Sequence, residues 1–211
     1  MGSAVTRTAS GPDVFAPLRA VLEGVVDSGA VPGIVVATGT SEATRFLRGH
    51  GWAQVVPTRE PMRAYTLFDL ASLTKVVVTT SLVGILCAEG RIDMEGRLDA
   101  YLTDLVGDAK GAVTVHQLLT HTSGLPAWRP FYRHCATREQ VRAAVLAEPL
   151  ADTPGARRTY SDLGFVLLGE VLERVSGQRL AALARERLFR PLGMLDTGFV
   201  PPSGLAARAA R

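Results

Sequence analysis

Apolar positions in the first quarter of the chain predict one helix followed by two strands. In residues 13–29, DVFAPLRAVLEGVVDSG, the apolar side chains fall on one face of a helix, with Asp13 as its N-cap and Gly29 after its end. The run PGIVVATG, residues 32–39, is rich in β-branched side chains and predicts a strand. Residues 43–54 predict a second strand, which the polar stretch TGTSE joins to the first as an antiparallel hairpin.

Helical patterns dominate after a predicted loop at 55–68. The longest and most apolar pattern runs from Ser72 to Glu89 and ends at Gly90, which suits a buried helix. A turn with a short helix is predicted at 92–102, and further helices at 114–120, 137–148, 161–177 and 179–189, with Thr114 as an N-cap and Thr137 with Gln140 as a capping box. We therefore predict an α+β fold in which residues 13–70 supply a helix and a hairpin and residues 71–200 form a helical region.

The N-terminal segment and the apolar runs bear on the cellular location of the protein. Residues 1–12 are polar and are predicted to be disordered, and they lack the apolar stretch of a signal peptide. The most apolar segment, 76–87, is too short to cross a bilayer. We therefore expect a cytoplasmic location and no membrane contact.

Charge and cysteine usage argue against several classes of partner. The formal net charge is +3, and acidic residues alternate with arginines, as in EVLERVSGQRLAALARERLFR. A basic face for nucleic acid is therefore not expected. Cys87 and Cys135 lie far apart, and neither the cysteines nor the histidines have the spacing of a metal site. We expect no cofactor, no metal ion and no nucleic acid.

The long apolar helix contains a lysine in a chain that uses arginine almost everywhere. Of the 23 basic residues, only Lys75 and Lys110 are lysines. Ser72 and Lys75 share a face at the helix N-terminus, where the helix dipole favours negative charge. Burial can lower the pKa of a lysine until it accepts a proton, which an arginine cannot do. The pair is consistent with Ser72 as a nucleophile and Lys75 as its base. It is equally consistent with a capped core helix whose lysine side chain extends to solvent. Lys110, between small residues in GDAKGA, is predicted to lie in a solvated loop.

A tyrosine directly before a predicted helix start is a second candidate for proton transfer. Tyr160 lies in TYSDLGF, where the following helix begins at Ser161 or Asp162. A nearby positive charge favours the phenolate, so a tyrosine beside a lysine can act as a general acid and base. Taken alone, this segment fits better an interfacial tyrosine whose hydroxyl group is hydrogen-bonded.

Three segments together resemble the serine β-lactamase-like hydrolases, which include class C β-lactamases, penicillin-binding DD-peptidases and related esterases. They are FDLASLTK, VHQLLTHTSGLP and TYSDLGFVLLGEVLERVSG, and the resemblance covers roughly residues 13 to 200. It implies a serine hydrolase that acts through an acyl-enzyme on a small ester or amide. It also implies Ser72 as the acylated nucleophile, Lys75 as its proton-accepting partner, Tyr160 as the second general base and His121 as a structural residue.

The chain departs from the family's second motif at Asp162. The family usually has Tyr-x-Asn, and this chain has Tyr160-Ser161-Asp162. An ionised Asp162 beside Lys75 would raise the pKa of the lysine and oppose its use as a base. Alternatively, Asp162 caps the helix that follows, and this is the role that we favour.

The family's third motif, Lys/His-Ser/Thr-Gly on a strand that lines the site, occurs nowhere in these 211 residues. The tripeptide DTG at 196–198 has an acid in the basic position. We therefore expect residues 13–211 to form one partial domain with an incomplete sheet, whose open edge favours self-association. Two functions stay open: an active serine hydrolase, or a truncated or inactive chain that another chain completes.

Overall fold

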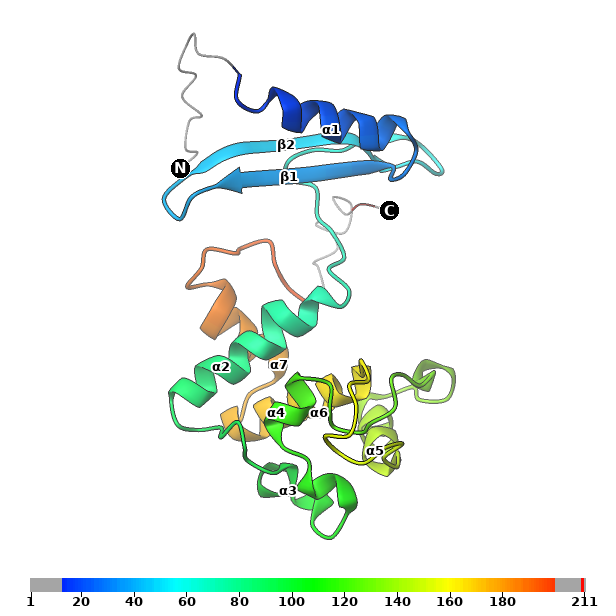
Figure 1. The fold of residues 1–211 in the computed structure, drawn as a ribbon, viewed down its shortest axis with the longest axis vertical. Coiled ribbons are helices and arrows are strands. Elements are labelled where there is room, and N and C mark those ends of the chain that lie inside the picture. The colour runs from blue at the N-terminus through cyan, green and yellow to red at the C-terminus, as the bar shows by residue number, and fades with distance from the viewer. Residues whose placement is uncertain (1–12, 200–209, 211) are drawn as a thin grey trace. The chain divides into compact units, whose positions relative to one another are not determined.

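The computed structural model describes residues 13–199 and residue 210, so the segment 1–12, predicted to be disordered, lies outside the described residues. The described residues divide into two compact units, one ending at Asp69 and including residue 210, the other beginning at Leu70. The two units therefore meet between residues 69 and 70 of the chain, whereas the sequence analysis placed the start of the helical region at residue 71. The elements confirm the predicted α+β fold with an incomplete sheet (Figure 1).

The first unit consists of one helix and a three-stranded antiparallel sheet. Helix α1 (Ala16–Asp27) lies along strands β1 (Gly33–Gly39) and β2 (Thr44–Gln54), which form the predicted hairpin (Figure 1). A short strand β3 (Glu60–Pro61) pairs with the end of β2, so the segment predicted as a loop adds a third strand. Among the described residues, β1 pairs only with β2. Self-association through this edge remains a prediction.

The predicted N-cap of α1 is wrong. Phe15 occupies the N-cap position, and no side chain caps the helix. Asp13 lies two residues earlier, where its Oδ1 accepts a hydrogen bond from the backbone N–H of Phe15 at 3.1 Å and its carboxylate pairs with Arg19. The helix starts later because Pro17 suits the first turn of a helix, where no N–H is needed.

The second unit is helical, as predicted. Its longer helices are α2 (Ser81–Ala88), α5 (Arg138–Ala147) and α6 (Asp162–Ser176), and the shorter ones are α3 (Leu98–Tyr101), α4 (Val115–Leu119) and α7 (Leu180–Ala184). The π-helical segments η1 (Lys75–Thr80) and η5 (Arg185–Phe189) adjoin α2 and α7, and the 3₁₀ turns are η2 (Thr103–Leu105), η3 (Ala109–Ala112) and η4 (Phe131–Arg133). The predicted N-cap at Thr114 and the predicted capping box of Thr137 with Gln140 are both formed, and Thr114 also forms a capping box with Gln117.

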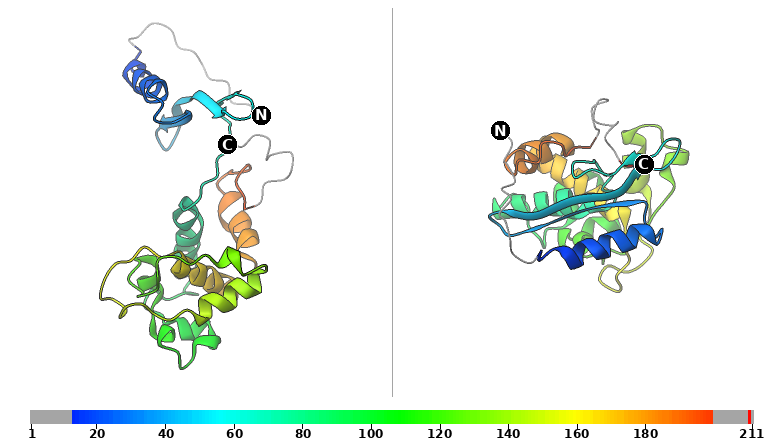
Figure 2. Two further views of the ribbon diagram at one scale, coloured as in Figure 1. Left: turned by 90° about the vertical axis from the view of Figure 1, so that its right-hand side faces the viewer. Right: turned by 90° about the horizontal axis from the view of Figure 1, so that it is seen from above.

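Helix α6 is the central element of this unit (Figures 1 and 2). Its apolar residues Leu167, Leu168, Val171 and Leu172 are buried in one core with side chains of α2, α4 and α7. Helix α4 packs on α6 beside Gly164, where a Cβ atom would be in ordinary contact with Leu118 Cδ2 at 3.5 Å. The packing therefore fixes the N-terminus of α6 relative to the segment that carries Ser72 and Lys75.

The predicted solvated position of Lys110 is wrong. Its side chain is buried, with the residue only 4% exposed, and Nζ lies 2.9 Å from Asp108 Oδ2. The 3₁₀ turn η3 folds the lysine back onto this aspartate, whose Oδ1 also accepts the backbone N–H of Lys110 at 2.8 Å. The loop thus holds an ion pair between the buried lysine and an exposed aspartate.

Within residues 13–199, no helix is both long enough and apolar enough to cross a membrane.

Candidate active site

Ser72 lies in the turn directly before the long helix. Helical structure begins at Leu73 and continues through η1 and α2 to Ala88, which confirms the predicted helix except for its start and its π-helical first part. Ala71 has a φ angle of 42°, in a region that non-glycine residues rarely adopt. This unusual backbone conformation, common at functional sites, places Ser72 at the mouth of the helix.

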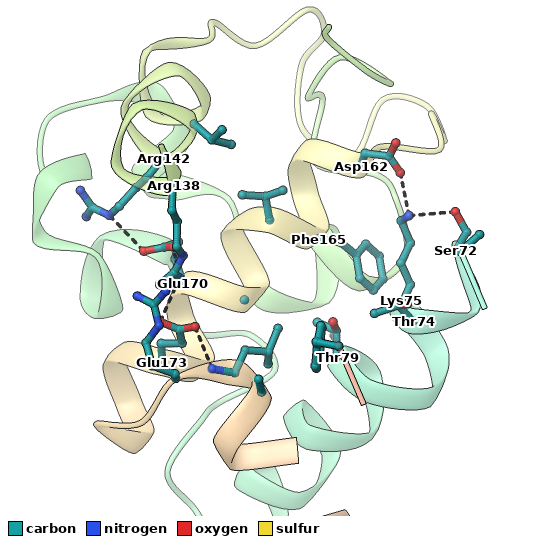
Figure 3. Close-up of a pocket in the computed structure, with 18 residues that line it drawn as sticks. Ser72, Thr74, Lys75, Thr79, Arg138, Arg142, Asp162, Phe165, Glu170 and Glu173 are labelled. Carbon is teal, nitrogen blue, oxygen red and sulfur yellow. Dashed lines mark hydrogen bonds and ion pairs between the residues drawn. The ribbon is translucent and has the colours of Figure 1, made fainter. Parts of the chain in front are cut away.

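Lys75 connects Ser72 with residues of α6 (Figure 3). Its Nζ donates a hydrogen bond to Ser72 Oγ at 3.2 Å and lies 2.6 Å from Asp162 Oδ1. Its ammonium group also lies 5.1 Å from the centre of the Tyr160 ring and 5.8 Å from that of Phe165. The lysine side chain is only 14% exposed, so its charge is held among these four groups.

The two candidate proton-transfer groups have shifted pKa values. Burial lowers the pKa of Lys75, but hydrogen bonding and charge from Asp162 and Tyr160 outweigh burial, and the net pKa is raised. Hydrogen bonding to Ser72 and then to Lys75 lowers the pKa of Tyr160. Lys75 is therefore a stable cation, and Tyr160 loses its proton more readily than an ordinary tyrosine.

His121 supports the segment that carries Tyr160. Its backbone carbonyl accepts the N–H of Thr159 at 2.8 Å, its Nδ1 accepts the N–H of Ser161 at 3.0 Å, and its ring lies 4.5 Å from that of Tyr160. Burial, followed by the charges of Arg158 and Lys75, lowers the pKa of His121, so the neutral ring can accept this hydrogen bond. These contacts fit the structural role expected from the family resemblance.

The prediction that Asp162 caps α6 is wrong, because Ser161 does so. The Oγ atom of Ser161 accepts the N–H of Gly164 at 3.2 Å and donates to the carbonyl of Pro126 at 2.7 Å. Asp162 is the first residue of the helix, and its side chain turns to Lys75 instead. Its Oδ1 is buried and accepts no hydrogen bond of regular geometry, so the lysine charge is what compensates it.

Replacing Ser161 is expected to destabilise the helical unit. The substitution Ser161→Ala removes an N-cap, which costs about 0.5–2 kcal/mol, and leaves the Pro126 carbonyl without its donor. We expect urea denaturation followed by circular dichroism to show a loss of about 2 kcal/mol in unfolding free energy. Ser176→Ala, at the exposed other end of α6, is the control and should change stability by less than about 0.5 kcal/mol. Equal effects of the two substitutions would contradict the capping role.

A cavity of about 620 Å³ extends from Ser72 and Lys75 along α6 (Figure 3). Its walls are largely apolar and include Val141, Phe165, Val166, Leu180, Ala181 and Phe199. At the other end Arg138 lies 2.7 Å from Glu170 and 2.9 Å from Glu173, and Arg142 lies 3.0 Å from Glu170. The volume is within the range of small-molecule sites.

Two parts of this site were not predicted from the sequence. Phe165 contacts both Lys75 and His121, and the only signal for it is its place one turn after Asp162 in the family-like segment. The arginines at 138 and 142 and the glutamates at 170 and 173 recur at helical spacing, which indicates charged helix faces. That these two faces meet depends on how α5 packs on α6.

A comparison with protein-family models identifies the chain. The model described as "Beta-lactamase" matches residues 18–211. The chain belongs to the β-lactamase family. The family resemblance expected from the three segments is thereby confirmed.

Curated relatives of this β-lactamase family chain are hydrolases. It is 33% identical to esterase EstB of Burkholderia gladioli over 205 residues, which cover 88% of this chain and 51% of that protein. It is 31% identical to an N-acetylmuramyl-L-alanine amidase of Bacillus subtilis (strain 168) over 153 residues, which cover 66% of this chain and 35% of that protein. The chain thus spans between about a third and a half of the length of these relatives.

Solved structures of the family share the fold. A penicillin-binding protein homologue from Caulobacter crescentus matches with a TM-score of 0.80 at 27% identity, over 96% of this chain and 55% of that chain. A class C β-lactamase matches with a TM-score of 0.83 at 23% identity, over 96% of this chain and 56% of that chain. The latter likeness concerns the fold alone.

Proposed function

We propose that this chain is a serine hydrolase that cleaves an ester or amide through an acyl-enzyme, with Ser72 as nucleophile and Lys75 and Tyr160 as its proton-transfer partners. The observation that carries the proposal is the placing of Lys75 beside both Ser72 and Tyr160. Lys75 Nζ donates to Ser72 Oγ at 3.2 Å and lies 5.1 Å from the centre of the Tyr160 ring, and the interactions with Ser72 and Lys75 lower the pKa of that tyrosine. A nucleophile held beside a proton-transfer group is the arrangement that covalent catalysis requires.

The first half-reaction forms the acyl-enzyme. The Oγ atom of Ser72 attacks the carbonyl carbon while its proton passes to the neighbouring base, and the carbonyl oxygen takes up the negative charge. The N-terminus of the helix that follows Ser72 favours this charge through its dipole. The bond to the leaving group then breaks as that group receives a proton.

The second half-reaction releases the acid. Water attacks the acyl carbon, the base accepts a proton from the water, and Ser72 recovers its proton as the acyl–Oγ bond breaks. The relatives named as an esterase and an amidase favour a carboxylic ester or an amide as substrate. The largely apolar cavity beside Ser72 provides space for the acyl group.

A covalent probe tests the proposal directly. A fluorophosphonate incubated with the folded chain should form one adduct, located on the tryptic peptide AYTLFDLASLTK, residues 64–75, whose only serine is Ser72. Mass spectrometry of the digest locates the adduct. Chain unfolded in urea before the probe is added should remain unlabelled, because it retains Ser72 and loses the arrangement around it. An adduct on another peptide of the folded chain would contradict the proposal.

A second candidate function is a chain that is acylated at Ser72 and does not turn over. One sequence observation favours it: no Lys/His-Ser/Thr-Gly tripeptide occurs among these 211 residues. In the family that the chain resembles, this motif lies on the strand that supplies the second hydrogen-bond donor to the oxyanion. Losing one such donor typically slows a reaction by about 10²–10³. Labelling at Ser72 without hydrolysis of p-nitrophenyl acetate would favour this candidate over the active hydrolase.

A further inference from the structure

The cavity that begins at Ser72 changes in chemical character along its length (Figure 3). Beyond Lys75 its walls are largely apolar, with Phe165 and Val166 contributed by α6. The far end is charged and holds arginines of α5 and glutamates of α6. All of these residues belong to the helical unit, so the cavity lies within one unit. A ligand that fills it therefore needs an apolar body and a polar end.

The geometry of α6 gives the length of the cavity. Asp162 contacts Lys75 at one end, and Glu173 contacts Arg138 at the other. These two α6 residues are eleven positions apart (173 − 162 = 11), which at a rise of about 1.5 Å per residue corresponds to about 16 Å. Carbon–carbon bonds are about 1.5 Å long, so a chain of about eight to ten carbons spans most of this distance.

The two glutamates at the charged end already have partners. Glu170 lies 2.7 Å from Arg138 and 3.0 Å from Arg142. Glu173 lies 2.9 Å from Arg138 through Oε2, and its Oε1 accepts the backbone N–H of Leu180 at 2.8 Å. Both carboxylates are therefore neutralised by the arginines of α5 and by α7.

Arg179 is a further cation in the lining of the cavity. It precedes α7 and is exposed, and within residues 13–199 no carboxylate forms an ion pair with its guanidinium. Its charge contributes to lowering the pKa of Glu139, although hydrogen bonds from the backbone of Glu139 and from Thr137 lower that pKa more. The lining thus has one positive charge in excess. Its four cations and three carboxylates are Lys75, Arg138, Arg142 and Arg179, and Asp162, Glu170 and Glu173.

We propose that this cavity binds an acyl chain that ends in a carboxylate, with the ester or amide carbonyl at Ser72 and the carboxylate on Arg179. The apolar walls favour the methylene groups of such a chain, because these leave water on binding. A guanidinium matches a carboxylate, since two parallel N–H···O bonds join them. The substrate class is then a monoester or monoamide of a dicarboxylic acid. Placing the reacting carbonyl at Ser72 rests on the proposed function, whereas binding of the chain and its carboxylate does not.

Binding to a chain that lacks the nucleophile tests the inference. The Ser72→Ala chain is titrated calorimetrically with monomethyl octanedioate, whose free end is a carboxylate, and with dimethyl octanedioate, whose free end is a neutral ester. The two probes share the same carbon chain, so a difference between them reports the carboxylate. We expect the monoester to bind about tenfold more tightly, the lower end of the gain from hydrogen bonds to charged groups. Equal affinities, or no binding of either probe, would overturn the inference.

Arg179→Gln assigns the preference to one residue. In the Ser72→Ala background it should weaken binding of the monoester about tenfold, to the affinity of the diester, and leave the diester unchanged. Arg185→Gln is the matched control, because Arg185 is an exposed arginine in η5 that lies outside the lining residues. This variant should retain the full preference. A preference for the monoester that survives Arg179→Gln would contradict the proposed role of Arg179.

A substitution in the apolar wall locates the bound chain. Val166 lines the cavity and is 37% exposed, so Val166→Trp places its larger side chain in the cavity rather than in the core. Both probes should then bind at least about tenfold more weakly, because the tryptophan occupies their space. Circular dichroism checks that the variant is folded. Unchanged binding of both probes to the folded variant would place them outside the cavity and overturn the inference.

Labelling of the wild type separates this inference from the proposed function. A chain that prefers the monoester through Arg179, and that a fluorophosphonate does not label at Ser72, would refute the proposed function and leave the cavity ligand established. A chain that is labelled at Ser72 and hydrolyses p-nitrophenyl acetate, but binds the two octanedioate probes equally, would support the proposed function and overturn the inference.

Discussion

Replacing Ser72 by alanine is expected to abolish covalent labelling by a fluorophosphonate. Ser72 Oγ accepts a hydrogen bond from Lys75 at 3.2 Å, and its interaction with Tyr160 helps to lower the pKa of that phenol. Without this oxygen the site has no atom that can form the acyl bond. The expected result is therefore a complete loss of labelling at probe concentrations that fully label the wild type.

The loss should not reflect unfolding. Ser72 is exposed in a turn, so its truncation leaves no cavity in the core, and the unfolding free energy should change by less than about 0.5 kcal/mol. Ser81→Ala is the matched control on the same helix, where the hydroxyl donates to the carbonyl of Val76 at 3.1 Å. This variant should be labelled like the wild type. Labelling of the Ser72→Ala chain at the wild-type rate would refute the assignment of the nucleophile.

Replacing Tyr160 by phenylalanine should slow labelling by about 10²–10⁴, the range in which a positioned general base contributes. The phenylalanine ring keeps the contacts with His121 at 4.5 Å and with Lys75 at 5.1 Å, so the substitution removes only the oxygen. The effect thus measures proton transfer and the loss of the hydrogen bonds made by that oxygen. Second-order rate constants for the probe give the comparison.

The control for this substitution is Tyr132→Phe. Both tyrosines are exposed, Tyr160 at 52% and Tyr132 at 70%, but Tyr132 lies in η4 against Trp128 rather than beside Ser72. Both variants should retain the unfolding free energy of the wild type, and Tyr132→Phe should retain its labelling rate. If Tyr160→Phe reacts as fast as Tyr132→Phe, Tyr160 has no role in moving the proton.

Local signals in the sequence predicted most elements of the fold correctly. Helical spacing located α6, β-branched residues located β1, and the Thr137/Gln140 pair located the start of α5, because each signal acts within a few residues of the chain. Predictions failed where a neighbouring side chain decided the outcome. Lys110 is buried because Asp108 pairs with it, and α1 begins after Phe15 because Pro17 suits its first turn.

For the candidate site, the sequence by itself determined the family and the residues Ser72, Lys75 and Tyr160 as candidates for its chemistry, because these depend on motifs and their order. Only the tertiary structure decided the partner of Lys75. Asp162 is 87 positions away from it along the chain (162 − 75 = 87), and sequence spacing could not distinguish a helix cap from an ion pair. Packing of α6 against η1 places the two charges 2.6 Å apart, while Ser161 caps the helix. A contact so remote in sequence is set by the shape of the packed core.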